Sequence, residues 1–225
     1  MIEVLVAGFF GYLMGSIFIS YFLVYFVKGI DLTKVGTGQL GASNTGRILG
    51  WPVMILVGLF DIFKAAFALF VITFFFGSSP CYGATIILSS CGIIIGHTHS
   101  LLIYLHKREW CGGKGGAPLG GVIFFLSWES FLILYFFLMP LIQLGKRLWK
   151  KQSIYENFIP NAIVGFFTPF VVLYLTGNPL YVFLILLLLG IIVYSEREKV
   201  KSILFPNSDD KDSISSSYLG INKSY

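Results

Sequence analysis

Long apolar runs are the feature of this sequence that most restricts its fold. Five runs can each cross the ~30 Å hydrocarbon core of a bilayer as a helix rising ~1.5 Å per residue, the last one only just. Only 12% of the residues are charged and the mean hydropathy is +0.82, whereas soluble domains carry roughly 25% charged residues. The sequence therefore predicts an all-α, polytopic transmembrane helical bundle. The runs cover residues 4–27, 51–76, 82–105, 158–176 and 179–194.

The stretch 117–144 fits either one long helix or two short helices broken near Ser127-Trp128-Glu129. A single crossing would place the basic cluster Lys146–Lys151 on the opposite side of the membrane from the basic residues of the other loops. Two passes place all of these residues on one side. Because basic loops stay on the cytoplasmic side, we favour two passes. This gives about seven membrane segments in the inner (plasma) membrane, with the N-terminus outside and the C-terminus cytoplasmic.

Composition, net charge and cysteine spacing set the limits of the domain and exclude some classes of function. Residues 1–205 are expected to form the transmembrane domain, and the polar, Ser/Asp/Lys-rich residues 206–225 predict a disordered cytoplasmic tail. The net charge of +5 does not indicate a nucleic-acid partner, because the basic residues lie in short gaps between apolar runs, where they set topology. The three cysteines are too scattered for a disulfide framework or a CxxC metal site.

The loop after the first apolar run is rich in glycine and contains GxGxxG at residues 36–41. A dinucleotide fold would need a preceding strand and a soluble βαβ unit, and neither is present in this sequence. Closely spaced glycines nevertheless let backbone N–H groups approach an anion. Hydroxyl and amide donors follow, and Arg47 adds a planar fork suited to phosphate. The loop therefore predicts a phosphate site, and a plain glycine-rich turn is the alternative.

A second loop, residues 112–118, places Lys114 among four glycines at a membrane boundary. It lacks the GxxxxGK[ST] spacing of a nucleotide-binding loop. The alternative is that Lys114 only snorkels to the interface as a topology anchor. If the two glycine-rich loops lie on the same side of the membrane, they can converge on one anionic ligand.

Two further groups of polar residues lie within or beside the apolar runs. Asp61 and Lys64 are three residues apart on one face of the second run. They either neutralise each other as a structural pair or extend the polar site into the bundle. His97 and His99 point to different faces of a helix and have no ligand at suitable spacing, so no metal site is expected. The GxxxG pairs Gly11–Gly15 and Gly92–Gly96 indicate close helix packing.

No motif for acid–base catalysis stands in this sequence: there is neither an HxxxxD pair nor a GxSxG elbow. The two loops together resemble the bacterial acyl-phosphate:glycerol-3-phosphate acyltransferase family, the PlsY type. Residues 36–47 match the spacing of that family's GSGNxGxTNxxR loop, and 112–115 match its GGKG loop. The resemblance runs in order through Gly15-Ser16-Ile17, Gly29-Ile30-Asp31, Gly36–Arg47, Asp61–Lys64, Gly96-His97 and Gly112–Ala117.

The resemblance implies a seven-helix membrane enzyme that moves an acyl group from acyl phosphate to the sn-1 hydroxyl of glycerol 3-phosphate. The products would be lysophosphatidic acid and phosphate. It implies no cofactor, and it makes acyl phosphate, glycerol 3-phosphate, membrane lipid and other lipid-synthesis enzymes the expected partners. By motif match, the catalytic residues would be Thr37, Ser43, Arg47 and Lys114. The substrate-binding residues would be Gly36, Gly38, Gln39, Gly41, Asn44, His97, Gly112, Gly113, Gly115 and Lys199.

The chain departs from the family pattern at several positions. Thr37, Gln39 and Ser43 stand where the family has Ser, Asn and Thr, and Pro118 replaces a Thr. In the run after the last apolar segment, Glu196 and Lys199 stand where the family has His and Asn. This second change leaves open a non-catalytic paralogue that scaffolds lipid synthesis. The charges inside the second apolar run leave open a small organophosphate transporter.

Overall fold

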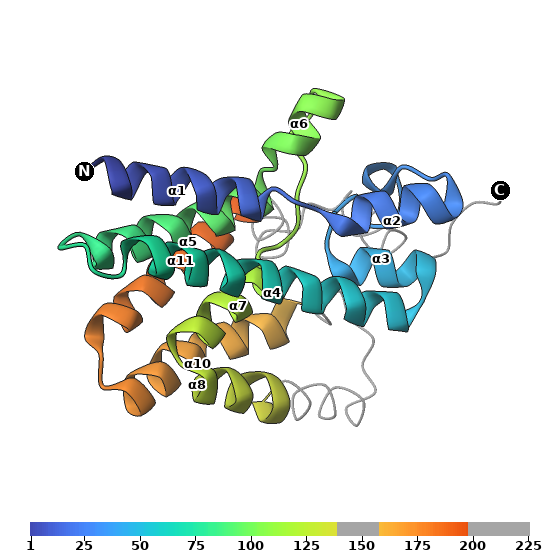
Figure 1. Cartoon of the computed structure of the whole chain (residues 1–225). Coiled ribbons are helices and arrows are strands. Elements are labelled where there is room, and N and C mark those ends of the chain that lie inside the picture. The colour runs from blue at the N-terminus through green and yellow to red at the C-terminus, as the bar shows by residue number, and fades with distance from the viewer. Residues whose placement is uncertain (139–157, 198–225) are drawn as a thin grey trace.

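The computed structural model describes residues 1–138 and 158–197, and within these ranges every regular element is helical (Figure 1). The all-helical fold predicted from the sequence is therefore confirmed for the described residues. Lys199 and the predicted tail 206–225 lie outside them. The helices are α1 (Ile2–Gly15), α2 (Ile19–Lys28), η1 (Leu32–Lys34), α3 (Ala42–Leu49), α4 (Trp51–Phe76), α5 (Tyr82–Thr98), α6 (Leu101–Lys107), α7 (Gly116–Leu126), α8 (Trp128–Leu132), η2 (Ile133–Leu138), α10 (Phe158–Thr176) and α11 (Pro179–Ser195).

Glycines bring α1 and α5 into backbone contact along most of their length. A Cβ at Gly92 would collide with the carbonyl of Gly8, and one at Gly96 with the carbonyl of Tyr12. From the other helix, a Cβ at Gly11 would collide with the carbonyl of Ser89. Small residues let helices approach this closely in a membrane, where packing rather than the hydrophobic effect joins them. The close packing predicted from the two GxxxG pairs is confirmed.

The first apolar run is broken rather than continuous, because the chain leaves helical geometry between Gly15 and Ile19. Phe18 is extended there, with φ −121° and ψ 97°. The third run breaks in the same way between α5 and α6 at His99 and Ser100. In Figure 1, α6 turns away from α5 and α2 continues beyond the end of α1.

The two breaks satisfy each other's backbone groups. The Ser100 hydroxyl donates to the Ser16 carbonyl at 2.7 Å, and the Leu101 N–H donates to the Ser16 hydroxyl at 3.3 Å. The Tyr12 hydroxyl donates to the carbonyl of His99 at 3.1 Å. Irregular backbone at membrane depth is tolerated only where its polar groups find such partners. The paired breaks therefore stabilise each other by hydrogen bonds at the point where α1, α2, α5 and α6 meet.

The helix over residues 117–138 breaks at Ser127, as one of the two sequence interpretations requires. Ser127 is extended, with φ −161° and ψ 100°, and its side chain caps α8 by accepting from the Ser130 N–H at 3.2 Å. Residues 139–144 lie outside the described ranges. Among the described residues, three stretches are long and apolar enough to cross a membrane, and four shorter helices are apolar. The number of crossings remains a prediction.

A second, smaller hydrophobic cluster lies apart from the main core and joins α2, η1, α6 and the first glycine-rich loop. Its fully buried members include Phe18, Val24, Leu32 and Leu40. The main core is formed instead by residues of α1, α4, α5, α7, η2, α10 and α11. The small cluster fixes both ends of the first loop against the helices that flank it.

Candidate functional site

Asn44 organises the first glycine-rich loop from inside. Its side-chain oxygen accepts the N–H of Thr37 at 3.0 Å, and its amide nitrogen lies 3.0 Å from the carbonyls of both Val35 and Gln39. The side chain is buried. Gly36 has φ +60°, and a Cβ there would collide with the Asn44 oxygen. The loop therefore wraps around one amide, and the predicted contact of Asn44 with substrate stays a prediction.

The first loop leads directly into the N-terminus of α3, where unpaired N–H groups favour an anion. Ser43 and Arg47 are four residues apart on α3, so they share one helix face, and both are exposed. Thr37 is half-buried. The structure thus places the Ser43 hydroxyl in the first turn of α3 and Arg47 in the last turn, on the same helix face, and both groups are suited to binding phosphate.

The second loop is held against the end of α5 by its own backbone. The Gly113 N–H donates to the His97 carbonyl at 2.8 Å, and the Ser100 N–H donates to the Cys111 carbonyl at 3.1 Å. Gly115, with φ +86°, precedes α7 in the left-handed conformation that favours glycine. Lys114 is half-buried directly before this helix N-terminus. The loop has no room for larger residues, because a Cβ at Gly112 would meet the carbonyls of His97 and Thr98.

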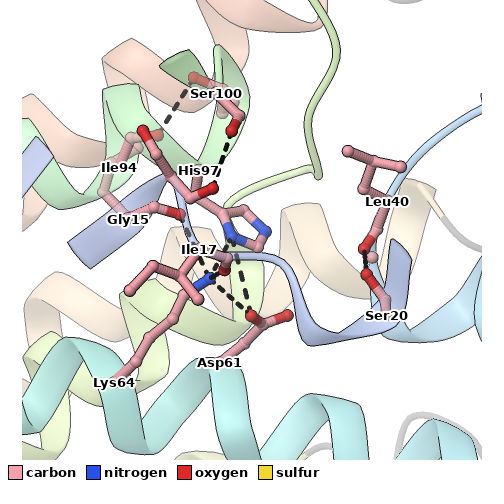
Figure 2. A network of polar contacts seen from close by, with 12 residues as sticks. Gly15, Ile17, Ser20, Leu40, Asp61, Lys64, Ile94, His97 and Ser100 are labelled. Carbon is pink, nitrogen blue, oxygen red and sulfur yellow. Dashed lines mark hydrogen bonds and ion pairs between the residues drawn. The ribbon is translucent and has the colours of Figure 1, made fainter. Parts of the chain in front are cut away.

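The two glycine-rich loops meet. The Leu40 N–H donates to the Gly112 carbonyl at 3.0 Å, so the first loop is bonded to the second by its backbone. The Ser20 hydroxyl donates to the Leu40 carbonyl from α2, which fixes Leu40 on its other side (Figure 2). Of the predicted residues, this contact brings those of 36–44 together with those of 112–115. The sequence predicted that the loops lie on one side of the membrane, and their direct contact agrees with it.

A buried charge cluster lies beneath the second loop (Figure 2). Lys64 pairs with Asp61 at 2.8 Å, and its ammonium also donates to the carbonyls of Ile17 at 2.6 Å and Gly15 at 3.2 Å. His97 Nδ1 lies 3.2 Å from the same ammonium. Each of the three ionisable side chains is 2% exposed. Lys64 therefore does more than neutralise Asp61, because its ammonium also binds the carbonyls at the break between α1 and α2.

An ion pair between Lys107 and Asp31 closes the outer edge of the first loop. Lys107 on α6 also contacts the Thr33 hydroxyl, and the Thr33 N–H donates to Asp31 at 3.0 Å. Partial burial acts to raise the pKa of Asp31, but the hydrogen bonds from Lys107 and Thr33 outweigh it and lower that pKa. Burial raises the pKa of the nearby Cys111 thiol. Asp31 and Lys107 were not predicted as site residues, although Gly29-Ile30-Asp31 was part of the family resemblance.

The end of α11 contacts the first loop through a side-chain hydrogen bond. The Gln39 amide donates to the Glu196 carboxylate at 2.8 Å, across 157 positions of sequence. Glu196 ends α11, where the negative end of the helix dipole disfavours an acidic residue. Both residues are positions at which the chain departs from the family pattern, so the two departures contact each other. Glu196 was not a predicted site residue, and only its unusual identity hinted at a role.

For the remaining predicted site residues, the structure gives less detail. Gly38 and Gly41 are half-buried within the first loop, and Lys199 lies outside the described residues. Among the residues that the structure describes, no group of three His, Cys, Asp or Glu side chains is placed to hold a metal ion. The donor set of the two loops consists of backbone amides, hydroxyls and cations, which suits phosphate oxygens rather than a metal.

The chain is similar to known proteins over most of its length. Residues 5–205 match the family model described as glycerol-3-phosphate acyltransferase. The glycerol-3-phosphate acyltransferase of Aquifex aeolicus is 29% identical over 87% of this chain and 92% of that protein. The Thermus thermophilus protein of the same name is 30% identical over 85% of this chain and 87% of its own length. Glycerol-3-phosphate acyltransferase 2 of Thermotoga maritima is 35% identical, and that match spans 65% of its length.

Solved structures show the same likeness. The crystal structure of PlsY (YgiH), an integral membrane glycerol 3-phosphate acyltransferase, in its glycerol 3-phosphate form has a TM-score of 0.68 and 25% identity, covering 89% of this chain and 92% of that one. Its lysophosphatidic acid form has a TM-score of 0.70 at 22% identity, which supports the fold. The integral membrane nature of the bundle is thereby confirmed.

Proposed function

The chain belongs to the glycerol-3-phosphate acyltransferase family, and on this premise we propose that it is a membrane acyltransferase that acylates glycerol 3-phosphate. The acyl donor is acyl phosphate and the product is lysophosphatidic acid. The observation that carries the proposal is the backbone contact between Leu40 and Gly112, which joins two glycine-rich, cationic loops in one place. The solved PlsY relative described as a glycerol 3-phosphate form supports the acceptor.

The proposed reaction needs little acid–base help from the protein. The sn-1 hydroxyl oxygen attacks the acyl carbonyl carbon, the bond from that carbon to the phosphate oxygen breaks, and the departing phosphate takes the hydroxyl proton. Because an acyl phosphate carries a good leaving group, positioning and charge stabilisation supply most of the acceleration. This agrees with the absence of an HxxxxD pair or GxSxG elbow from the sequence.

The proposed roles follow the geometry of the two loops. Arg47 and Lys114 bind phosphate oxygens, and Thr37 and Ser43 donate hydrogen bonds to them. Asn44 holds the first loop in shape. Glycine amides of both loops line the site. The acyl chain enters sideways from lipid between the helices, and the loops face the cytoplasm, with the N-terminus outside.

The structure weakens the reading of the chain as an organophosphate transporter. That reading rested on Asp61 and Lys64 inside the second apolar run. Both are committed to each other and, in the case of Lys64, to the carbonyls of Gly15 and Ile17. With these partners, the two charges stabilise the break between α1 and α2, and they offer no path for a moving substrate.

The test compares two acyl donors with purified protein in lipid nanodiscs. With acyl phosphate and glycerol 3-phosphate, we expect one phosphate released for each lysophosphatidic acid formed, and no product with acyl-CoA. Arg47→Ala and Lys114→Ala should each lower the rate by roughly 100-fold or more, the scale seen when one charge-stabilising donor is removed. Lys34→Ala, which removes an exposed charge from the same loop region, is the matched control. Acylation from acyl-CoA alone, or phosphate release without acylation, would contradict the proposal.

A further inference from the structure

The end of α11 contacts both glycine-rich loops from one helix face. The Gln39 amide of the first loop donates to the Glu196 carboxylate at 2.8 Å. One turn earlier, the Ile192 side chain packs over the second loop, because a Cβ added to Gly115 would lie 3.0 Å from its Cγ1. Residues four apart share one face of a helix, and the Glu196 N–H donates to the Ile192 carbonyl at 3.1 Å. The end of α11 is therefore a third element of the site, beside the two loops.

Resting on the function proposed above, we propose that Glu196 is a positioning residue for acyl transfer, which holds the first loop in place through Gln39. An ionised carboxylate has hydrogen-bond acceptors only, and an ionised phosphate likewise presents acceptor oxygens. The two anions also repel each other. Glu196 is therefore unsuited to binding a substrate phosphate, whereas it can accept a hydrogen bond from the protein. The Gln39 amide provides that hydrogen bond.

Gln39 stands directly before the point where the two loops are bonded to each other. Its own carbonyl accepts from the Asn44 amide at 3.0 Å. The next residue, Leu40, donates its N–H to the Gly112 carbonyl at 3.0 Å. Because its side chain is bonded to Glu196, Gln39 is held at both its backbone and its side chain. A shift of this residue would move Leu40 as well and disturb the bond between the loops.

The helix alone gives no reason for a carboxylate at position 196. Glu196 ends α11, where the negative end of the helix dipole disfavours an acidic side chain. The side chain is also half-buried, so it loses part of its hydration. The hydrogen bond from Gln39, a residue 157 positions away, acts against both costs. The first loop thus explains the identity of residue 196 better than its own helix does.

The contact of α11 with the second loop depends on volume rather than on charge. Gly115 has φ +86° and directly precedes α7. Ile192 fills the space that a side chain would take there, since its Cδ1 would lie 3.3 Å from a Cβ at Gly115. Ile192 also packs against the main core. The last turn of α11 is therefore seated firmly at the second loop, and from this position Glu196 can fix the first.

Two substitutions at residue 196 separate a hydrogen-bonding role from the role of a charge or a proton acceptor. Glu196→Gln keeps an oxygen that can accept from Gln39, whereas Glu196→Ala keeps none. With acyl phosphate and glycerol 3-phosphate in nanodiscs, we expect kcat/KM to fall roughly tenfold in the alanine variant, the scale of one hydrogen bond to a charged group. The glutamine variant should stay within about threefold of the unaltered protein. Glu109→Ala, which removes an exposed carboxylate, is the control and should leave kcat/KM unchanged.

A double-mutant cycle tests whether Glu196 acts through Gln39. Gln39→Ala removes the donor, so the contact between α11 and the first loop is already lost in this variant. We expect the double variant Gln39→Ala/Glu196→Ala to lose no more kcat/KM than Gln39→Ala alone. Losses that multiply would overturn the proposal, because the two residues would then act independently.

Three further outcomes would also overturn the positioning role. Equal losses in Glu196→Gln and Glu196→Ala would show that the reaction needs the charge or a proton acceptor, and not the hydrogen bond. An alanine variant with unaltered kcat/KM would show that the contact has no part in the reaction. The alanine variant should melt at nearly the temperature of the unaltered protein, and a loss of folded protein would reduce Glu196 to a structural residue. An unaltered protein that does not acylate glycerol 3-phosphate would instead defeat the proposed function, and this inference with it.

Discussion

The α1–α5 interface and the glycine-rich loops use the same residue type in opposite ways. In the interface, Gly92 and Gly96 remove side chains so that two helix backbones touch. In the loops, Gly36 and Gly115 adopt positive φ, and hydrogen bonds rather than contact area hold the backbone in place. Close packing is destroyed by added volume, whereas a hydrogen-bonded loop is destroyed by a lost partner. Damage to the first should therefore cost folding, and damage to the second should cost activity.

Lys64 is the point at which the two regions join. It lies on α4 within the bundle, yet it binds the carbonyl at the end of α1 and touches the histidine that supports the second loop. The glycine-rich loops are thus not structurally independent of the helix bundle. Their geometry depends on a charge buried among the helices, which explains why an ion pair so costly in a membrane is present.

The largest effect is expected from added volume at the helix interface. Gly96→Leu would drive a side chain into the backbone of Tyr12, an obstacle that cannot move aside, so the cost should exceed the usual ~1–3 kcal/mol of overpacking. We expect little folded protein by size-exclusion chromatography. Gly190→Leu on α11, where a Cβ meets nothing within 4 Å, should fold normally. Equal yields of the two variants would show that the interface is looser than described.

The corresponding substitution in the first loop is Asn44→Ala, which removes the side-chain amide that the loop backbone surrounds. Several hydrogen bonds of roughly 1 kcal/mol each are lost, so we expect acyl transfer to fall tenfold or more. The melting temperature in detergent should change far less than for the helix-interface variant. A variant that unfolds without any intermediate loss of activity would place Asn44 with the bundle instead.

A smaller effect is expected where the last helix touches the loop. Gln39→Glu sets two carboxylates face to face at the Glu196 contact, and this should weaken binding of glycerol 3-phosphate by roughly fivefold, the scale of a partly exposed charge pair. Adding Glu196→Gln restores an amide–carboxylate bond with the partners exchanged. Recovery of affinity in the exchanged pair supports the contact, and strictly additive losses argue against it.

The smallest effect concerns the outer ion pair of the first loop. The pKa of Asp31 is lowered from its ordinary value of 3.8, so its contribution to stability is fully present above that pH and is lost as the pH falls through the lowered value. Asp31→Asn should therefore reduce stability by at most about 1 kcal/mol at neutral pH. The difference from the unaltered protein should shrink on acidification below pH ~4. Thermal melts at several pH values measure this, and a difference that grows in acid would contradict the assignment.

The sequence predicted the features that depend on composition and local spacing. Apolar runs identified the helices, GxxxG pairs identified the α1–α5 packing, and basic residues favoured the break near Ser127. The contact between the glycine-rich loops was also predicted, because both had to lie on one side of the membrane.

The breaks at Phe18 and His99 were not predicted, because hydropathy does not report backbone hydrogen bonding. Both breaks lie within apolar runs. Side chains distant in sequence, Lys64 and Ser100, satisfy carbonyls at the first break, and the Tyr12 hydroxyl satisfies the His99 carbonyl at the second. The contact of Gln39 with Glu196 was missed for a related reason. It joins residues 157 positions apart, and no local pattern encodes such a pairing.

The most direct test of the account is a double-mutant cycle on glycerol 3-phosphate binding with Arg47→Ala and Lys114→Ala, measured by equilibrium dialysis without turnover. If the two loops form one anion site, each substitution weakens binding strongly, and the double variant loses less than the product of the two single losses, with a coupling of about 0.5–3 kcal/mol. Losses that are fully independent, or no larger than that of Lys34→Ala, would contradict a shared site.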